Sequence, residues 1–201
     1  MSLLSERTRE IYDRNAGAYD GLRNRALTER AWLLRALADV PDGGAVLDLG
    51  CGTGAPIGEW LLGQGVALTA VDFAPAMVEI ARRRLPAAEV LVADMRALAL
   101  AQRFDAVIGW GSFFHLTPDE QRATLPRLVR HLNPGGRLLL TVGPGAGEVT
   151  GTVAGDTVYH ASLSPEEYAA ILAREGAPVE EFRPEDPDCT GHSLVVARRN
   201  H

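Results

Sequence analysis

The chain of 201 residues contains no lysine, so arginine supplies all 20 of its lysine and arginine positions. This absence excludes any mechanism in which a lysine forms a Schiff base with its substrate. It also removes the Tyr-x-x-x-Lys pair that would serve an NAD-dependent oxidoreductase as proton donor.

Cysteine and long apolar runs are also scarce. Cys51 and Cys189 are the two cysteines, too few for a disulfide framework, which favours a reducing cytoplasm. No run of 18 apolar residues occurs, and the N-terminus lacks a charged segment followed by an apolar one. We therefore expect a cytoplasmic protein that neither enters a membrane nor is secreted.

The charge balance bears on the class of partner. A formal net charge of −6 and a pI near 5.4 argue against a partner recognised mainly through phosphates, so nucleic acid is not expected. The consecutive arginines Arg82, Arg83 and Arg84 fit a solvated helix face better than a nucleic-acid patch. A hydrophobic content of 46% is enough for a sizeable core in one domain.

One stretch combines a short apolar run with three glycines spaced two apart. Residues 45–54 read Ala-Val-Leu-Asp-Leu-Gly-Cys-Gly-Thr-Gly, which predicts a buried parallel strand, a tight turn and then a helix opened by Pro56. The turn leaves room for a ligand against the backbone, and free amides at the helix start would face it. Asp72 closes a second apolar strand about 20 residues after Gly50, where nucleotide-binding βαβ units place the carboxylate that holds ribose hydroxyls. The pairing indicates a nucleoside ligand.

The same stretch resembles the first motif of class I S-adenosylmethionine-dependent methyltransferases, of the type 11 and type 25 small-molecule kind, and Asp72 falls on that family's ribose-binding acid. Residues 92–95, 104–108 and 132–138 continue the resemblance in the family's order. Gly50, Gly52 and Ala55 also satisfy the dinucleotide pattern of NAD enzymes, but the order of all four segments favours the methyltransferase.

The resemblance implies S-adenosyl-L-methionine as the cofactor and a set of contacts to it. These are Tyr12, Tyr19, Asp48, Gly50, Cys51, Gly52, Gly54, Asp72, Phe73, Met77, Asp94, Met95, Trp110 and Gly111. In the family the acid at Asp94 hydrogen-bonds the adenine amino group, whereas the sequence alone explains it equally as a helix N-cap. No metal is expected, because Cys189-x-x-His192 offers too few ligands for a structural zinc site.

Strand and helix signals alternate with short connections, which predicts an α/β fold with helices on both faces of a parallel sheet. With the resemblance, this becomes a doubly wound Rossmann-like sheet, mostly parallel, with an antiparallel edge strand at the C-terminus. We expect a single domain over residues 1–201. It divides into a helical flap and helix (1–40), a cofactor-binding core (41–144), an acceptor-side loop (145–163), and a C-terminal helix and strand pair (164–201).

Two explanations stay open for the N-terminal segment 4–20. Tyr12 and Tyr19 lie on one helical face, while Asn15, Gly17 and Gly21 weaken a continuous helix. The family resemblance suggests a flap whose tyrosines fold over the cofactor. A surface helix docked by its aromatic side chains explains the pattern equally well. Residues 28–40 predict an amphipathic helix that contributes only to the core.

Residues that follow the fourth and fifth strands are candidates for the acceptor side of the site. His115 is the best candidate for a general base, with Tyr159 next, and a base is needed only if the acceptor arrives protonated. Packing of His115 against the cofactor, or capping of a helix, is the alternative. The loop 145–163 is longer than usual, could form a short hairpin, and is expected to cover the acceptor.

The sequence therefore predicts a methyltransferase that moves a methyl group to an unidentified small-molecule acceptor by in-line displacement. Trp110, Phe113 and Phe114 beside Tyr159 suggest an acceptor with an aromatic or apolar body, with core packing as the competing explanation for the phenylalanines. The Asp/Asn-Pro-Pro-Tyr signature of amino-methylating nucleic-acid and glutamine enzymes is absent after the fourth strand. A non-catalytic S-adenosylmethionine-binding module and an NAD-dependent oxidoreductase are the alternatives. No oligomeric state is predicted.

Overall fold

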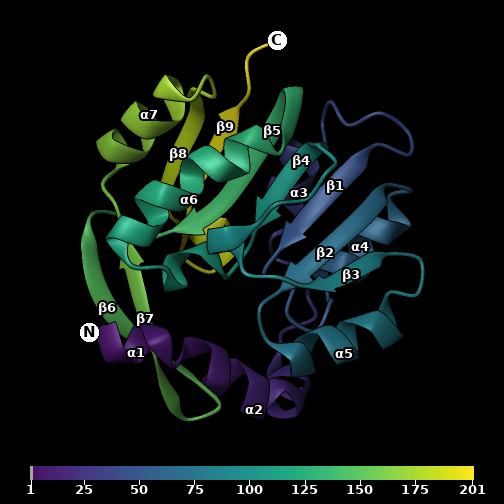
Figure 1. Cartoon of the computed structure of the whole chain (residues 1–201), viewed down its shortest axis with the longest axis vertical. Coiled ribbons are helices and arrows are strands. Elements are labelled where there is room, and N and C mark those ends of the chain that lie inside the picture. Colours follow the sequence, from purple (N-terminus) through teal and green to yellow (C-terminus); the bar gives the residue numbers. More distant parts are fainter. Residues whose placement is uncertain (1) are drawn as a thin grey trace.

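A computed structural model describes residues 2–201, and its centre is a seven-stranded sheet in the order β3-β2-β1-β4-β5-β9-β8 (Figure 1). The strands are β1 Ala45–Leu49, β2 Ala67–Asp72, β3 Glu89–Val92, β4 Phe104–Gly109, β5 Leu132–Val142, β8 Val179–Asp186 and β9 His192–Arg198. β1 to β5 are parallel, and β9 pairs antiparallel with both β5 and β8. The predicted Rossmann-like sheet is confirmed, with the antiparallel strand β9 one place in from the edge strand β8.

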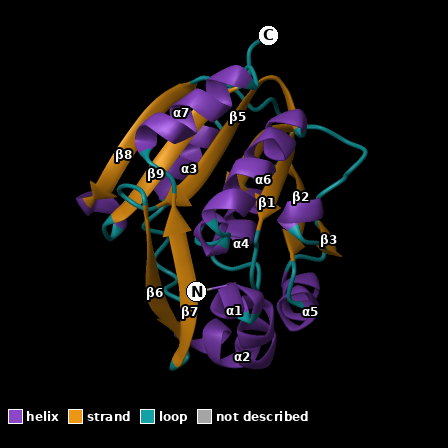
Figure 2. Cartoon of the chain, turned by 60° about the vertical axis from the view of Figure 1, so that its left-hand side comes forward, coloured by secondary structure: helices purple, strands orange, loops and turns teal. Residues whose placement is uncertain are grey.

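Helices cover both faces of this sheet (Figure 2). On one face lie α3 Arg30–Ala36, α4 Ile57–Gly63 and α5 Pro75–Arg84, and on the other α6 Pro118–Arg130 and α7 Pro165–Arg174. Side chains alternate along each strand, so Val46 packs towards the first group and Leu47 towards the second. The strands are therefore apolar on both sides, as the continuous hydrophobic run in β1 requires.

Side chains cap the starts of α6 and α7. Thr117 and Glu120 form a reciprocal capping box at the start of α6, and the Ser164 side chain accepts from the Glu167 amide at the start of α7. The helix predicted over 28–40 is shorter, because the chain after Ala36 tightens into turns such as the one closed by the Val40 amide on the Leu37 carbonyl. Among residues 2–201, no helix is long and apolar enough to cross a membrane.

The N-terminal segment forms α1 Ser2–Glu6 and α2 Thr8–Leu22, and α2 continues through Asn15, Gly17 and Gly21, the residues expected to weaken it. Tertiary contacts stabilise α2 against the helix penalty of about 1 kcal/mol for each glycine. Ile11 and Ala16 are buried, and the Asp13 carboxylate accepts from the Ala76 amide at the start of α5.

Asp20, near the end of α2, holds the helix to the glycine turn. Its carboxylate accepts from the Thr53 hydroxyl at 2.6 Å and pairs with Arg84 at 2.8 Å. Figure 1 shows α1 and α2 lying at the carboxyl ends of the parallel strands, at the same end as the hairpin described next.

The segment 145–163 forms a two-stranded hairpin, β6 Gly147–Val153 and β7 Asp156–Ser162, one of the outcomes that its sequence allowed. Ala154 and Gly155 make the turn, both with positive φ. Asp156 then joins the hairpin to α2 by accepting from Arg14 at 3.1 Å and from Asn15 at 2.7 Å. The hairpin, α2 and the glycine turn are thus linked.

Gly54 is required by packing between the glycine turn and α5. Its φ is +83°, and a Cβ there would lie 2.8 Å from Leu85 Cδ1 and 3.5 Å from Ala81 Cα. We expect Gly54→Ala to lower the free energy of unfolding in urea by about 1–3 kcal/mol, from backbone strain and overpacking together. Gly63→Ala is the control, because a Cβ there has no atom within 4 Å, and it should change stability by less than about 0.5 kcal/mol. Equal losses in the two variants would contradict this explanation.

Candidate active site

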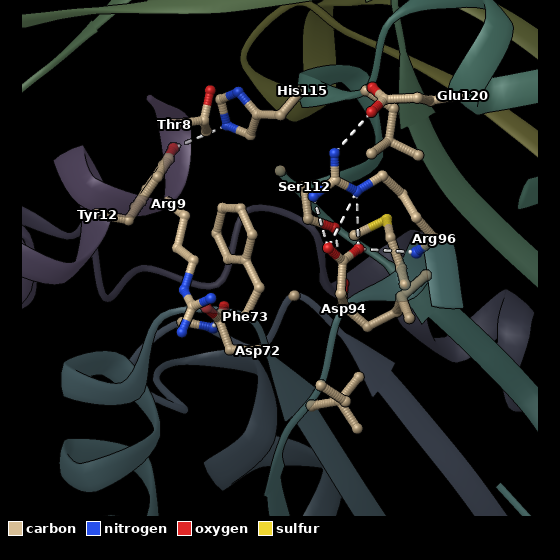
Figure 3. A pocket seen from close by; sticks show the side chains of 18 of the residues that line it. Thr8, Arg9, Tyr12, Asp72, Phe73, Asp94, Arg96, Ser112, His115 and Glu120 are labelled. Carbon is tan, nitrogen blue, oxygen red and sulfur yellow. Dashed lines mark hydrogen bonds and ion pairs between the residues drawn. The ribbon is translucent and has the colours of Figure 1, made fainter. Parts of the chain in front are cut away.

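A cavity lies between the N-terminal helices and the carboxyl ends of β1, β2, β3 and β4 (Figure 3). It encloses about 830 Å³ of space free of protein atoms, with open solvent at its mouth included. The main lining side chains and glycines are Thr8, Arg9, Tyr12, Tyr19, Gly50, Gly52, Asp72, Phe73, Asp94, Met95, Arg96, Trp110, Gly111, Ser112, His115 and Glu120.

The glycine turn brings the ends of β1 and β4 into close contact. A Cβ on Gly50 would lie 2.3 Å from the Ser112 Cβ, so only glycine fits there. The Ser112 hydroxyl donates to the Leu49 carbonyl at 2.6 Å, and the amides of Gly50 and Cys51 both donate to the Val71 carbonyl. The turn is therefore fixed to both neighbouring strands.

Asp72 is the buried carboxylate beside this turn. Its Oδ2 accepts from the Gly52 amide and its Oδ1 from the Ala74 amide, both at 2.9 Å. Burial raises the pKa of Asp72 to about 6, although the amide hydrogen bonds act in the opposite direction. A carboxylate oxygen can accept two hydrogen bonds, so Asp72 retains capacity for hydroxyl groups in the cavity.

Three charged side chains close another part of the cavity wall. Arg96 pairs with Asp94 at 2.6 Å and with Glu120 at 2.6 Å. Burial pushes the pKa of Asp94 up, but the hydrogen bonds from Arg96 outweigh it and the net pKa is lowered. Asp94 also accepts from the Arg96 amide as the N-cap of a short 3₁₀ turn, so the capping explanation holds in the structure while the adenine contact stays a prediction.

His115 is held through both of its ring nitrogens. Nδ1 lies 2.9 Å from the Tyr159 carbonyl oxygen, which only accepts, so Nδ1 carries the proton. Nε2 lies 2.8 Å from the Tyr12 hydroxyl and accepts from it in the neutral ring. Burial lowers the pKa of His115 to about 4, with the Tyr159 carbonyl acting in the opposite direction. Burial likewise raises the pKa of Tyr12, so both groups are neutral near pH 7.

Four of the predicted contact residues, Asp48, Cys51, Gly54 and Met77, do not line the cavity, so their contacts to a cofactor stay predictions. Met77 is fully buried with Ala16 and Ala74 beneath α2, and Gly54 faces Leu85. Asp48 and Cys51 are buried behind the turn, where burial raises the pKa of Asp48 to about 7, helped by the charge of Asp72.

The aromatic cluster beside the fourth strand is also only partly in the cavity. Phe113 is fully buried in the core, so core packing is the correct explanation for it. The Tyr159 side chain is 1% exposed, and it is the backbone carbonyl of this residue that reaches His115. Trp110 lines the cavity and Phe114 lines a neighbouring groove.

Arg9, Arg96 and Glu120 line the cavity but were not predicted from the sequence. The Glu120 side chain both closes the capping box at the start of α6 and pairs with Arg96. Residues 96 and 120 are far apart along the chain, so no local signal reports the pair. Among residues 2–201, no group of three histidine, cysteine or acidic side chains is arranged to hold a metal ion.

Known proteins resemble this chain in sequence and in fold. Residues 46–136 match the family model described as a methyltransferase domain. The solved structure of CalS10, an amino pentose methyltransferase from Micromonospora echinaspora described as bound to SAM, superposes with a TM-score of 0.71 at 27% identity, covering 92% of this chain and 95% of that one. The match to the family model covers a little under half of the chain, and it agrees with the resemblance to class I S-adenosylmethionine-dependent methyltransferases.

Curated methyltransferases match over shorter stretches. A probable tRNA methyltransferase 9B of Mus musculus is 31% identical over 71% of this chain and 30% of its own length. A dTDP-4-amino-2,3,4,6-tetradeoxy-D-glucose N,N-dimethyltransferase of Saccharopolyspora spinosa is 31% identical over 48% of this chain and 39% of its own length. The match thus spans well under half of these two relatives.

The protonation state of His115 tests the hydrogen bonds assigned to its ring. We expect its ring, followed by NMR, to titrate near pH 4 instead of near 6.5. Since the unfolded state binds this proton more readily, His115 lowers the stability of the fold as the pH falls from about 6.5 to 4, by up to about 3 kcal/mol.

Asp48 and Asp72 have raised pKa values and act in the opposite direction over part of this pH range, so the stability comparison needs a variant. His115→Asn should lose less stability than the parent on acidification. An imidazole that titrates above pH 6 in the folded protein would contradict the assigned hydrogen bonds.

Proposed function

We propose that this chain transfers a methyl group from S-adenosyl-L-methionine to a small-molecule acceptor. The observation that carries the proposal is the position of the buried Asp72 carboxylate at the carboxyl end of β2, against the amide of Gly52 and open to the cavity. A vicinal diol satisfies such a carboxylate, as in other nucleotide-binding βαβ units.

The cavity lining offers groups for each part of the proposed cofactor. Asp72 and Phe73 would hold the ribose, and Asp94, Met95 and Leu116 would surround the adenine. The turn at Gly52 would face the amino-acid end, where a Cβ would meet only the Tyr19 ring, at 3.5 Å. The cofactor supplies a methyl group already activated on a sulfonium, so the protein has mainly to hold donor and acceptor in line.

Tyr12 and His115 lie where an acceptor would meet the methyl group. Because the Tyr12 hydroxyl donates to His115 Nε2, its oxygen remains free to accept an N–H or O–H from the acceptor. His115 orients Tyr12 through this bond. With its lowered pKa, His115 is a weak base, so we assign it to hydrogen bonding and orientation more than to proton removal.

The relatives agree with a small acceptor. The Saccharopolyspora enzyme is named for an amino sugar and CalS10 for an amino pentose, although the probable tRNA methyltransferase matches as well. A non-catalytic binding module would retain Asp72 and the glycine turn. The neutral Tyr12–His115 pair beside the cavity favours catalysis over that alternative.

The cofactor assignment is tested by calorimetric titration with S-adenosylhomocysteine. Asp72→Ala should weaken binding about ten- to a hundred-fold, since a hydrogen bond to a charged group contributes about 1.5–3 kcal/mol. Asp42→Ala is the matched control, because this exposed acid precedes β1 at the opposite end of the strands. Equal affinity in the parent and Asp72→Ala would overturn the ribose assignment.

Transfer itself is tested with isotope-labelled methyl donor against pooled metabolites, nucleic acids and protein extract in parallel. We expect label in the metabolite fraction and at least a tenfold lower rate in Tyr12→Phe, which lacks the oxygen that would face the acceptor. Label only in macromolecules would contradict the small-molecule assignment. Binding without transfer to any fraction would favour the non-catalytic module.

A further inference from the structure

The mouth of the cavity carries two arginines. Of the residues that line the cavity, the exposed ones are Glu6 at the end of α1, Arg9 on α2 and Arg96 just after β3. The cavity therefore opens between the N-terminal helices and the turn at residues 94–96. A small molecule that enters here passes both guanidinium groups.

The two arginines differ in what they already bind. All three guanidinium nitrogens of Arg96 are occupied, because Nε and Nη2 donate to Asp94 and Nη1 donates to Glu120. Arg9 makes no ion pair or side-chain hydrogen bond with any residue that the structure describes, Glu6 included. A guanidinium carries five N–H donors in a planar fork that matches a carboxylate or a phosphate. Arg9 thus keeps all of its donors for an incoming ligand.

Arg9 lies close to the place where the methyl group would be transferred. Arg9 and Tyr12 both line the cavity from α2 (Figure 3), and side chains three residues apart are neighbours on one helix face. Burial raises the pKa of Asp94 and Arg96 lowers it, and the charge of Arg9 adds to the lowering, so the guanidinium faces the cavity. Arg9 is therefore one helical turn from the hydroxyl group assigned above to the acceptor.

The other charges of the site favour a negative acceptor. Arg96 neutralises Asp94 and Glu120, and Tyr12 and His115 are neutral near pH 7. The bound cofactor would add a positive sulfonium. An ammonium group on the acceptor would meet both this charge and Arg9, whereas an anionic group is attracted by both. Glu6 opposes that attraction at the mouth, where solvent screens its charge.

Resting on the proposed methyl transfer, we propose that the acceptor is a small anion whose carboxylate or phosphate is held by Arg9 while its reacting N–H or O–H lies at the Tyr12 oxygen. The two side chains leave α2 one turn apart, so one small molecule can contact both. Arg9 binds a group that does not react, and it thereby selects the acceptor.

The reaction balances without any other reactant. The lone pair of the reacting nitrogen or oxygen forms the new bond to the methyl carbon as the C–S bond of the sulfonium breaks. The electron pair of the broken bond stays on sulfur, and the proton of the N–H or O–H passes to water. The anionic group keeps its charge throughout, so the methylated product is an anion as well.

The charge of the acceptor is tested with metabolites separated by ion exchange at pH 7 into anionic, neutral and cationic pools. Each pool is offered to the protein with isotope-labelled methyl donor. We expect about tenfold or more label in the anionic pool than in either other pool, in a product that an anion exchanger still retains. Label that persists after phosphatase treatment of the pool identifies a carboxylate, and label that is lost identifies a phosphate.

The possible failures are distinguishable. Label mainly in the neutral or cationic pool, or a labelled product of the anionic pool that the exchanger no longer retains, overturns the assignment to Arg9 and leaves the proposed function standing. No label in any pool counts against the proposed function itself.

Arg9→Gln removes the charge and supplies the second measurement. In a dilution series of the anionic pool, the apparent KM should rise about ten- to a hundred-fold while kcat stays within about threefold, because the lost contact is to a group that does not react. Arg30→Gln is the matched control, an exposed arginine on α3 outside the cavity lining, and should leave the apparent KM unchanged. Calorimetry with S-adenosylhomocysteine should give equal affinity in the parent and both variants. An unchanged KM in Arg9→Gln, or weaker binding of S-adenosylhomocysteine, overturns the proposal.

Salt separates a charge contact from a change in packing. The parent should show a rising apparent KM between about 0.01 M and about 1 M ionic strength, since the Debye length falls from about 30 Å to about 3 Å. Arg9→Gln should respond less, and Arg9→Lys, which restores the charge, should recover part of the affinity and of the salt response. The same salt response in the parent and Arg9→Gln would contradict the role of Arg9.

Discussion

The carboxylate of Asp72 is the point on which the cofactor side of this molecule depends. It accepts from the amide of Gly52 in the glycine turn and from the amide of Ala74 just before α5, and it faces the cavity as well. One buried group thus shapes the turn, fixes the start of the next helix and offers acceptors to a ligand. Burial also raises the pKa of Asp72, because the charged carboxylate loses hydration at the place where these contacts hold it.

Three other carboxylates hold α2 in place over the cavity. Asp13 accepts from the Ala76 amide, Asp20 pairs with Arg84 of α5, and Asp156 of the hairpin accepts from Asn15. These contacts connect α2 both to α5 and to the hairpin. Movement of the hairpin is therefore coupled to α2, and through Tyr12 to His115.

Much of the fold could be predicted from the sequence, because its signals are local. The apolar run at β1, the glycine turn and the Thr117 capping box each specify structure within a few residues, and all three are present. The continuity of α2 could not be predicted, since contacts with α5 and the hairpin override the glycines within it. Helix propensity describes an isolated segment, whereas α2 is stabilised by its contacts with α5 and the hairpin.

The same distinction between local and long-range signals applies to the residues of the site. Gly50, Gly52 and Asp72, which the recognisable spacing of a turn and a strand end singles out, line the cavity. Met77 lies beneath α2 instead, because the sequence does not distinguish a methionine that faces a ligand from one that packs in the core. The Arg96 bridge and the groove beside Phe114 arise from residues far apart in the chain, so only the folded arrangement reports them.

The hydrogen bond between His115 and Tyr159 runs through the backbone of β7. The carbonyl oxygen is the same for every amino acid, so the tautomer of His115 is set by the path of the hairpin and not by the side chain at position 159. Substitutions that keep the strand in register leave this contact intact, and an alanine scan would miss it. The hairpin can therefore diverge in sequence while the proton stays on the same nitrogen of His115.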